Sequence, residues 1–168
     1  MPRFVVVPVF LAQLLVMSAV FLRVDNPEGG RWYKMRSFGV GGVVAVEMDV
    51  EQTQPLLEVK LGNSDGNVLF DLVCDLEATK ISTSLSEGEM KSGTLSLSGV
   101  KTVRLVVELQ SEGVFVDLVG VGSVMLPYPA HSWSGNENTT WLSVDTISRV
   151  YLGGRGLKFT HLSGYVLV

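Results

Sequence analysis

The sequence predicts an all-β protein, an antiparallel β-sandwich of two sheets with jelly-roll topology, from three observations. Apolar and polar residues alternate with a period of two in several segments, as they do in strands with one buried and one solvated face. Glycine, asparagine, serine and aspartate separate these segments at short intervals. After residue 23, no segment sustains an apolar repeat at helical spacing over three turns.

The first 22 residues precede this pattern and differ from it in composition. The amino terminus and Arg3 form a short positive region, and an uncharged run follows from Phe4 to Leu22. This order is typical of a secretory signal helix, because the positive end stays in the cytosol while the apolar run enters the translocon. We expect cleavage near Ala19 and a secreted, extracellular product. The alternative is a membrane anchor at residues 4–22, since about 20 residues span a bilayer.

The polar segment 23–32, RVDNPEGGRW, is predicted to link the signal segment to a β-sandwich domain at 33–168. Without Arg3, the exported part has 12 basic residues against 17 acidic ones, since the whole chain has 13 and 17. The basic residues are scattered singly, without the basic stripe that nucleic-acid binding requires. We therefore expect no nucleic-acid partner, and contact with a membrane only through an uncleaved N-terminal segment.

Four segments show the alternation most clearly. Their apolar faces are Val44, Val46, Met48 and Val50; Leu57, Val59 and Leu61; Val68, Phe70, Leu72, Cys74 and Leu76; and Val103, Leu105, Val107 and Leu109. These sets predict half-buried strands. Cys74 is the only cysteine, which excludes an intrachain disulfide, and its place in an apolar set predicts a small core side chain.

Turn residues separate the strands. Hairpin turns are predicted at 62–67, 86–93 and 110–114, and the glycine runs at 39–42, 120–123 and 153–156 are predicted to be turns, bulges or close sheet approaches. A phosphate-binding loop must instead open a helix. About ten to twelve strands in one domain are too many for a single flat sheet, so two sheets are expected to pack face to face. A closed barrel is the alternative.

Neither histidine suggests catalysis. His161 lies in a strand pattern, where Phe159, Ser163 and Tyr165 are predicted to share its half-exposed face. His131 lies in a loop without a cysteine or a nucleophile-elbow sequence beside it. We therefore expect no catalytic residues and no enzyme.

Metal and cofactor sites are not predicted either. Asp71, Asp75 and Glu77 share one strand face, whereas calcium ligands usually come from a loop that wraps the ion. Zinc has no cluster of cysteines and histidines to hold it. We expect no metal and no cofactor.

The segment 124–141, VMLPYPAHSWSGNENTTW, is the strongest candidate for binding. Its prolines disfavour a central ladder position, so it is predicted to be a loop at one end of the sandwich. The candidate ligand-binding residues are Tyr128, His131, Trp133, Asn136, Trp141 and, from another segment, Arg155. The rings either stack on a ligand or fill the open end of the sandwich. Asn138 begins a glycosylation sequon, Asn-Thr-Thr.

Three segments carry a resemblance to known families. They are LLEVKLGNSDGNVLFDL at 56–72, LVVELQSEGVFVDLVGVGSVMLPYPAHSW at 105–133 and ISRVYLGGRGLKFTHLSG at 147–164. Their order of strands and turns resembles the galectin-type, concanavalin-like jelly roll and, more closely, the farnesoic acid O-methyltransferase-like domain of secreted animal proteins. This resemblance implies the sandwich fold and a role in recognition.

The resemblance does not extend to the families' functional motifs. A galectin has His-x-Asn-x-Arg near the position of 70–80 and Trp-Gly-x-Glu-x-Arg near 84–93, where this chain retains only Glu89 and Lys91 as counterparts. Methyl transfer needs a glycine-rich turn between strand and helix, which the sequence lacks. We expect a secreted, non-catalytic recognition module that binds carbohydrate or glycoprotein through the end loop. The alternative is a structural or protein-interaction domain.

Overall fold

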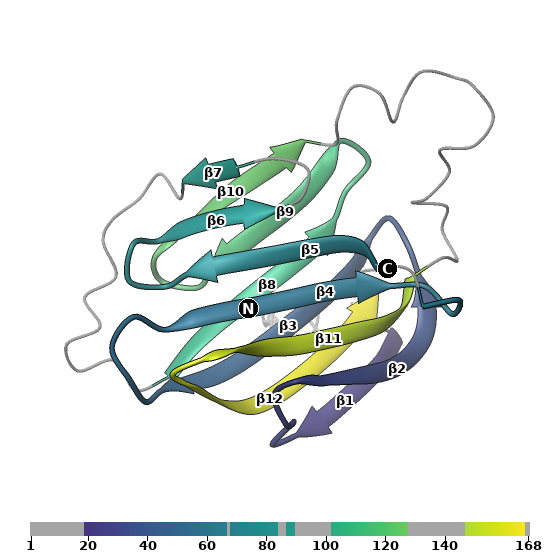
Figure 1. Cartoon of the computed structure of the whole chain (residues 1–168). Coiled ribbons are helices and arrows are strands. Elements are labelled where there is room, and N and C mark those ends of the chain that lie inside the picture. The colour runs from purple at the N-terminus through teal and green to yellow at the C-terminus, as the bar shows by residue number, and fades with distance from the viewer. Residues whose placement is uncertain (1–18, 67, 84–86, 90–101, 128–146, 167–168) are drawn as a thin grey trace, which may run out of the picture.

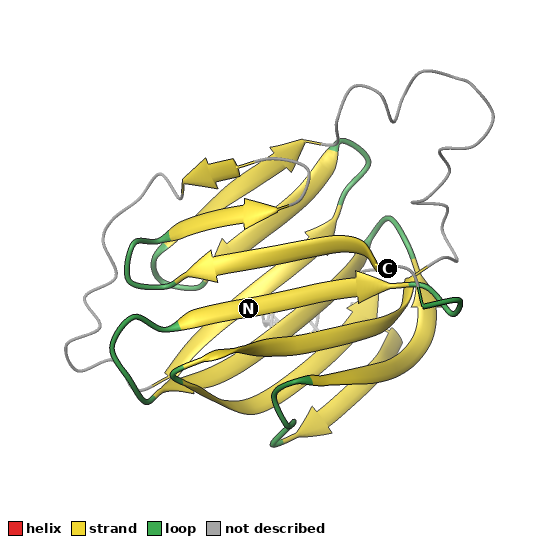
Figure 2. Ribbon diagram, viewed as in Figure 1, coloured by secondary structure: helices red, strands yellow, loops and turns green. Residues whose placement is uncertain are grey.

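The computed structural model describes residues 19–66, 68–83, 87–89, 102–127 and 147–166, and these residues form β-strands and turns (Figure 2). The strands are β1 (Ala19–Asp25), β2 (Arg31–Phe38), β3 (Gly42–Val50), β4 (Leu56–Gly62), β5 (Val68–Asp75), β6 (Lys80–Thr83), β7 (Glu87–Glu89), β8 (Thr102–Leu109), β9 (Gly113–Leu118), β10 (Gly122–Pro127), β11 (Ile147–Arg155) and β12 (Leu157–Val166).

The strands form two six-stranded sheets that pack face to face (Figure 1). Sheet A has the order β1-β12-β3-β8-β9-β10, and sheet B has the order β2-β11-β4-β5-β6-β7. Every neighbouring pair is antiparallel. The predicted antiparallel two-sheet sandwich is therefore confirmed, and the barrel alternative is excluded for the described strands.

The core lies between the sheets and follows the predicted alternation. The residues with no exposed surface include Val44, Val46, Met48, Leu57, Val59, Leu61, Leu72, Cys74, Leu76, Leu105, Val116, Leu118, Val150, Leu152 and Leu162. Cys74 is a core side chain, as predicted. Val68 is the exception in its set, because it is 49% exposed. The β4–β5 register shifts between Leu61 and Gly62, which takes Val68 out of the core alternation.

The predicted turns lie where the hairpins need them. The described residues 63–66 lie between β4 and β5, and residues 110–112 join β8 to β9. Gly41, Gly120 and Gly156 have φ values of 86°, 83° and 69° between successive strands, a conformation that glycine adopts without strain. The prediction of a plain turn at 86–93 is wrong in part, because β7 occupies 87–89 and pairs with β6.

The N-terminal boundary also differs from the prediction. Strand β1 covers Ala19–Asp25 and pairs with β12, so the sandwich begins before residue 33. The Phe21 ring stacks on Phe38 at 4.8 Å between centroids, and the Leu22 side chain is buried in the core. Segment 23–32 is therefore not a linker, since it contains the end of β1, a tight turn and the start of β2. A sequence pattern could not show this, because the apolar residues of an edge strand and of a signal segment look alike.

The predicted signal segment covers residues 1–22, and its residues 1–18 lie outside the described residues. Ala19–Leu22 are described and belong to β1, so the predicted helix does not extend over these four residues. Within the described ranges, the chain has no helix that is long and apolar enough to cross a bilayer.

Strand β12 contains an irregularity that the alternation did not predict. Phe159 pairs with Met48 and His161 with Glu47, so Thr160 is an extra residue in the ladder. Phe159 is buried in the core, whereas His161 lies on the outer face of sheet A with its Nδ1 2.8 Å from Asp25 Oδ1. The prediction that Phe159 and His161 share a face is therefore wrong, while the half-exposed position of His161 is confirmed.

Candidate functional site

The outer face of sheet B carries two aromatic rings side by side, at the edge formed by β2. The cross-strand register aligns Trp32 of β2 with Tyr151 of β11, and Tyr151 with Lys60 of β4. The ring centroids of Trp32 and Tyr151 are 5.5 Å apart, with an angle of 52° between the planes. Trp32 is 39% exposed, an unusual amount for the largest apolar side chain. We call this pair and its charged neighbours the aromatic platform.

A cation lies beside each ring of the platform. The Lys60 Nζ is 5.4 Å from the centroid of the Tyr151 ring, and the Arg149 Cζ is 5.7 Å from the centroid of Trp32. Both distances are within the range of a cation–π interaction. Each ring of the platform therefore has a positive charge of its own within cation–π distance.

Carboxylates complete the platform. The Glu58 carboxylate lies 2.8 Å from Lys60 Nζ, and this hydrogen bond is the main reason why the pKa of Lys60 is raised above its ordinary value. Asp71 lies opposite Lys60 in the ladder and raises the pKa further. The platform thus combines flat apolar surfaces with hydrogen-bond donors and acceptors, the combination that can stack on a sugar ring and bind its hydroxyl groups.

Glycine allows the Tyr151 ring to lie against the sheet. A Cβ atom on Gly153 would come within 2.7 Å of Tyr151 Cε1 and 2.9 Å of its hydroxyl oxygen. Any other residue at 153 would lift the ring away from the strand. The predicted close sheet approach in the run 153–156 occurs at Gly154, where a Cβ atom would collide with the Leu56 carbonyl oxygen of β4.

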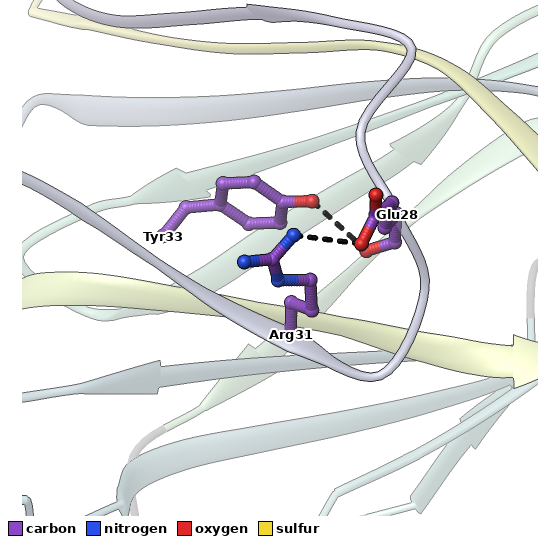
Figure 3. Close-up of polar contacts among 3 residues, drawn as sticks. All are labelled: Glu28, Arg31 and Tyr33. Atoms are coloured by element: carbon purple, nitrogen blue, oxygen red, sulfur yellow. Dashed lines mark hydrogen bonds and ion pairs between the residues drawn. The ribbon is translucent and has the colours of Figure 1, made fainter.

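Figure 3 shows the polar contacts of Glu28, Arg31 and Tyr33, which hold the turn between β1 and β2 beside Trp32. The Tyr33 hydroxyl donates a hydrogen bond to the Glu28 carbonyl oxygen at 2.9 Å, and Arg31 Nη1 lies 2.7 Å from Glu28 Oε2. The Tyr33 ring packs against the core. Because neighbouring strand residues point to opposite faces, an inward Tyr33 directs Trp32 outward.

The β4–β5 turn positions Arg149. The Arg149 Nε and Nη2 atoms donate hydrogen bonds to the carbonyl oxygens of Asn63 and Ser64, at 3.0 and 3.2 Å. The Asn63 side chain accepts a hydrogen bond from the Asp65 amide, which shapes the turn. The segment predicted to be a plain hairpin turn is one, and it also fixes a cation of the platform.

The candidate residues of the end loop fall outside this description. Tyr128, His131, Trp133, Asn136, Asn138 and Trp141 all lie in 128–146, outside the described residues. The two attachment points of that segment, Pro127 and Ile147, lie at one end of the sandwich, since Pro127 pairs with Gly113 next to the β8–β9 turn and Ile147 pairs with Phe38 next to the β2–β3 turn.

Arg155 is separated from the loop's attachment by the length of β11. Ile147 begins this strand and Arg155 ends it, a distance of roughly 26 Å at about 3.3 Å per residue. The Arg155 Nε donates to the Gln54 carbonyl oxygen at 3.3 Å, and Arg155 pairs with Leu56 in the ladder. The structure thus does not bring Arg155 to the place where the loop joins the sheet.

Trp32, Tyr151 and their charged neighbours were not predicted as site residues. Trp32 was assigned to a linker, and Tyr151 has no local motif around it. One signal was available: Trp32 and Lys34 alternate with Tyr33 and Met35, and Arg149 and Tyr151 alternate with Val150 and Leu152. That alternation places aromatic side chains on the solvent face, which is unusual for a half-buried strand.

Metal coordination has no support in the described ranges, which contain no group of three or more His, Cys, Asp or Glu side chains placed to hold an ion. The Cys74 thiol is not available for nucleophilic chemistry, because burial raises its pKa to about 12.

No protein-family model and no curated protein sequence matches the chain. The resemblance to the farnesoic acid O-methyltransferase-like domain therefore stays a prediction.

Solved structures show where the fold occurs. A tetrameric galectin from the ball sponge Cinachyrella is similar over 80% of this chain and 98% of its own, with 14% identity and a TM-score of 0.56. Sheep galectin-11, in complex with glycerol, is similar over 82% of this chain and 98% of its own, with 12% identity and a TM-score of 0.56. Toad ovary galectin in complex with thio-digalactose is similar over 87% and 98%, with 14% identity and a TM-score of 0.50. The predicted galectin-type jelly roll is thereby confirmed as the fold of this protein.

Proposed function

We propose that this protein is a non-catalytic carbohydrate-binding module, and that the aromatic platform on sheet B is its binding surface. The observation that carries the proposal is the exposed Trp32 ring, tilted against Tyr151 and flanked by Arg149 and Lys60. An exposed ring offers an apolar face to the C–H side of a pyranose. Charged groups beside the ring form hydrogen bonds with the sugar's hydroxyl groups. These bonds fix the orientation of the sugar and the specificity of binding.

The fold supports the same proposal. Toad ovary galectin, which is similar to this chain in fold, was solved in complex with thio-digalactose and with N-acetylgalactose. The galectin-type sugar motifs expected at 70–80 and 84–93 are missing from this sequence. A sugar site in this chain therefore needs other residues, and the platform at β2, β11 and β4 supplies aromatic and charged ones.

The end loop is a second place where sugar or glycoprotein could bind, through Tyr128, His131, Trp133, Asn136 and Trp141. A glycan on Asn138 would crowd that loop, so use of the sequon and binding there compete. One experiment can distinguish binding at the platform from binding at the end loop, because Trp32 belongs to the platform and Trp133 to the loop.

A glycan array probed with the intact protein and with single variants tests the proposal. Trp32→Ala is expected to lower the signal at least about tenfold, because a stacked aromatic ring contributes one to a few kcal/mol. Met125→Ala is the matched control, since Met125 is 38% exposed on the other sheet. Loss of signal in Trp133→Ala but not in Trp32→Ala would move the site to the end loop.

Absence of glycan binding by the folded protein would instead favour the alternative, a structural or protein-interaction domain. In that case the exposed Trp32 would serve as an anchor for a protein partner on edge strand β2. Loss of partner binding in Trp32→Ala, with no glycan bound, is the result that would establish it.

Export is also part of the proposal. It is supported by the positive start and the uncharged run of residues 4–22. N-terminal sequencing of the product from secretory cells is expected to show removal of about the first twenty residues. A membrane-bound product that retains Met1 would favour the anchor.

A further inference from the structure

A pocket of about 280 Å³ opens between β2 and β11, next to the aromatic platform. Its lining residues are Lys34, Met35, Ser64, Ser148 and Arg149. The ladder between the two strands is irregular here, because Ile147 pairs with Phe38 and Arg149 with Lys34. Three residues of β2 therefore lie opposite the single residue Ser148 of β11, and the strands cannot keep their regular spacing.

The polar groups around this pocket are mainly donors. Lys34 brings an ammonium and Arg149 a guanidinium, and no Asp or Glu side chain lines the pocket. Arg149 bonds two turn carbonyls through Nε and Nη2, which leaves further N–H groups of its five for another acceptor. Within the described ranges, no carboxylate pairs with the Lys34 ammonium. The Ser64 hydroxyl makes one long bond of 3.4 Å, to Asp65.

Ser148 adds an independent observation. Its Oγ is buried and has no hydrogen-bond partner among the described residues. Buried hydroxyl groups are almost always hydrogen-bonded, since an unpaired one is unfavourable. Ser148 also lines the pocket, so its hydroxyl group is an unused hydrogen-bond donor beside the space that a ligand would occupy.

We propose that this pocket binds the anionic group of an acidic sugar, a sulfate ester or a carboxylate, whose ring stacks on Trp32. The inference rests on the proposed function and names its ligand class. Arg149 connects the two parts, because its guanidinium lies 5.7 Å from the Trp32 ring centroid and also lines the pocket. Sulfate and carboxylate oxygens accept several hydrogen bonds at once, which matches a pocket of ammonium, guanidinium and hydroxyl donors.

The first test uses inorganic sulfate and does not depend on sugar stacking. NMR titration of the protein is expected to shift the backbone amide signals of Lys34, Ser148 and Arg149. Lys34→Gln is expected to abolish these shifts, while Lys80→Gln, an exposed lysine toward the other side of sheet B, retains them. Ser148→Ala is expected to weaken sulfate binding without lowering the melting temperature, because the lost hydroxyl has no partner to leave unpaired. If Lys34→Gln and Lys80→Gln had equal effects on the sulfate-induced shifts, the proposal that this pocket binds the anion would be overturned.

The second test compares neutral, sulfated and sialylated forms of the same glycans on an array. The acidic forms are expected to bind more tightly, and Lys34→Gln is expected to weaken them at least about tenfold while neutral binding stays unchanged. The sulfated and sialylated arms identify which anion the pocket prefers. Neutral glycans that bind as tightly as acidic ones would overturn this inference and leave the proposed function intact. Absence of binding to every glycan would overturn the proposed function itself.

Discussion

The Tyr151 ring lies over the backbone of Gly153, two residues further along β11, where an added Cβ would approach Tyr151 Cε1 to 2.7 Å. The strand residue that carries the ring and the glycine that accommodates it share one face of sheet B. The close packing against Gly153 keeps the Tyr151 ring beside Trp32 and Lys60. A substitution at Gly153 is therefore expected to disturb the platform without removing either aromatic residue.

Gly153→Ala is expected to displace the Tyr151 ring and to weaken sugar binding, while the free energy of unfolding changes by less than about 1 kcal/mol. The new methyl group meets the end of a side chain that can rotate, and Gly153 does not have a positive φ. Glycan affinity and urea denaturation measured on the same samples check this. Unchanged affinity would show that the ring position is not important for binding.

Gly154→Ala is expected to behave in the opposite way, with a loss of about 3 kcal/mol or more in stability. Gly154 has a φ of 136°, and a Cβ there would collide with the Leu56 carbonyl oxygen of the neighbouring strand. Neither the backbone angle nor the paired strand can adjust as a side chain does. Equilibrium denaturation is the measurement, and a midpoint equal to that of the wild type would contradict the assigned geometry.

Removing residues 1–18 is expected to leave the stability of the sandwich intact, whereas removing residues 1–25 is expected to lower it by about 3 kcal/mol or more. The longer deletion eliminates β1, with the buried Leu22 and the stacked pair of Phe21 and Phe38. Melting temperatures of the two truncated chains test this. Equal melting temperatures would mean that β1 adds nothing to the fold.

The buried thiol of Cys74 is expected to make the stability of the protein fall at alkaline pH. Burial raises its pKa from 9.0 to about 12, with a smaller contribution from the charge of Asp75. The folded state therefore holds the thiol proton more tightly than the unfolded state does. The contribution of this protonated thiol to the free energy of unfolding is fully present below pH 9. It is lost as the pH rises from about 9 to about 12, by about 1 kcal/mol per pH unit.

Cys74→Val is the control for that titration, because valine keeps an apolar side chain of similar size and has no proton to lose. Urea denaturation at pH 8, 9 and 10 is expected to show a steeper decline for the wild type than for the variant. The same burial predicts slow reaction with thiol reagents until the protein unfolds. Rapid labelling of the folded protein at pH 8 would contradict the burial of Cys74.

Short-range patterns predicted most of the architecture. The alternation in Val44–Met48, Leu57–Leu61 and Val103–Leu109 identified β3, β4 and β8 and their core faces, because side chains in a strand change sides at every residue. The alternation was less reliable where the ladder is irregular. At Phe159 and Thr160 an extra residue reverses the faces, and such a bulge depends on the partner strand.

The N-terminal boundary required the tertiary structure for a related reason. Ala19–Leu22, the first half of β1, continue the uncharged run that starts at Phe4, and their composition does not separate an edge strand from a signal segment. Pairing with β12 and stacking of Phe21 on Phe38 decide the matter, and both partners are distant in sequence. Segment 23–32 therefore could not be assigned from its own residues.

The sequence by itself determined the all-β class, the core side of most strands and the burial of Cys74, since these follow from local periodicity. Only the tertiary structure decided which solvent-facing residues are neighbours. Trp32, Lys60 and Tyr151 come from parts of the chain far apart in sequence, and they meet because β2, β11 and β4 are adjacent in sheet B. Alternation fixes the face of a strand but not its partners, and strand order arises from the long-range packing of the whole sandwich.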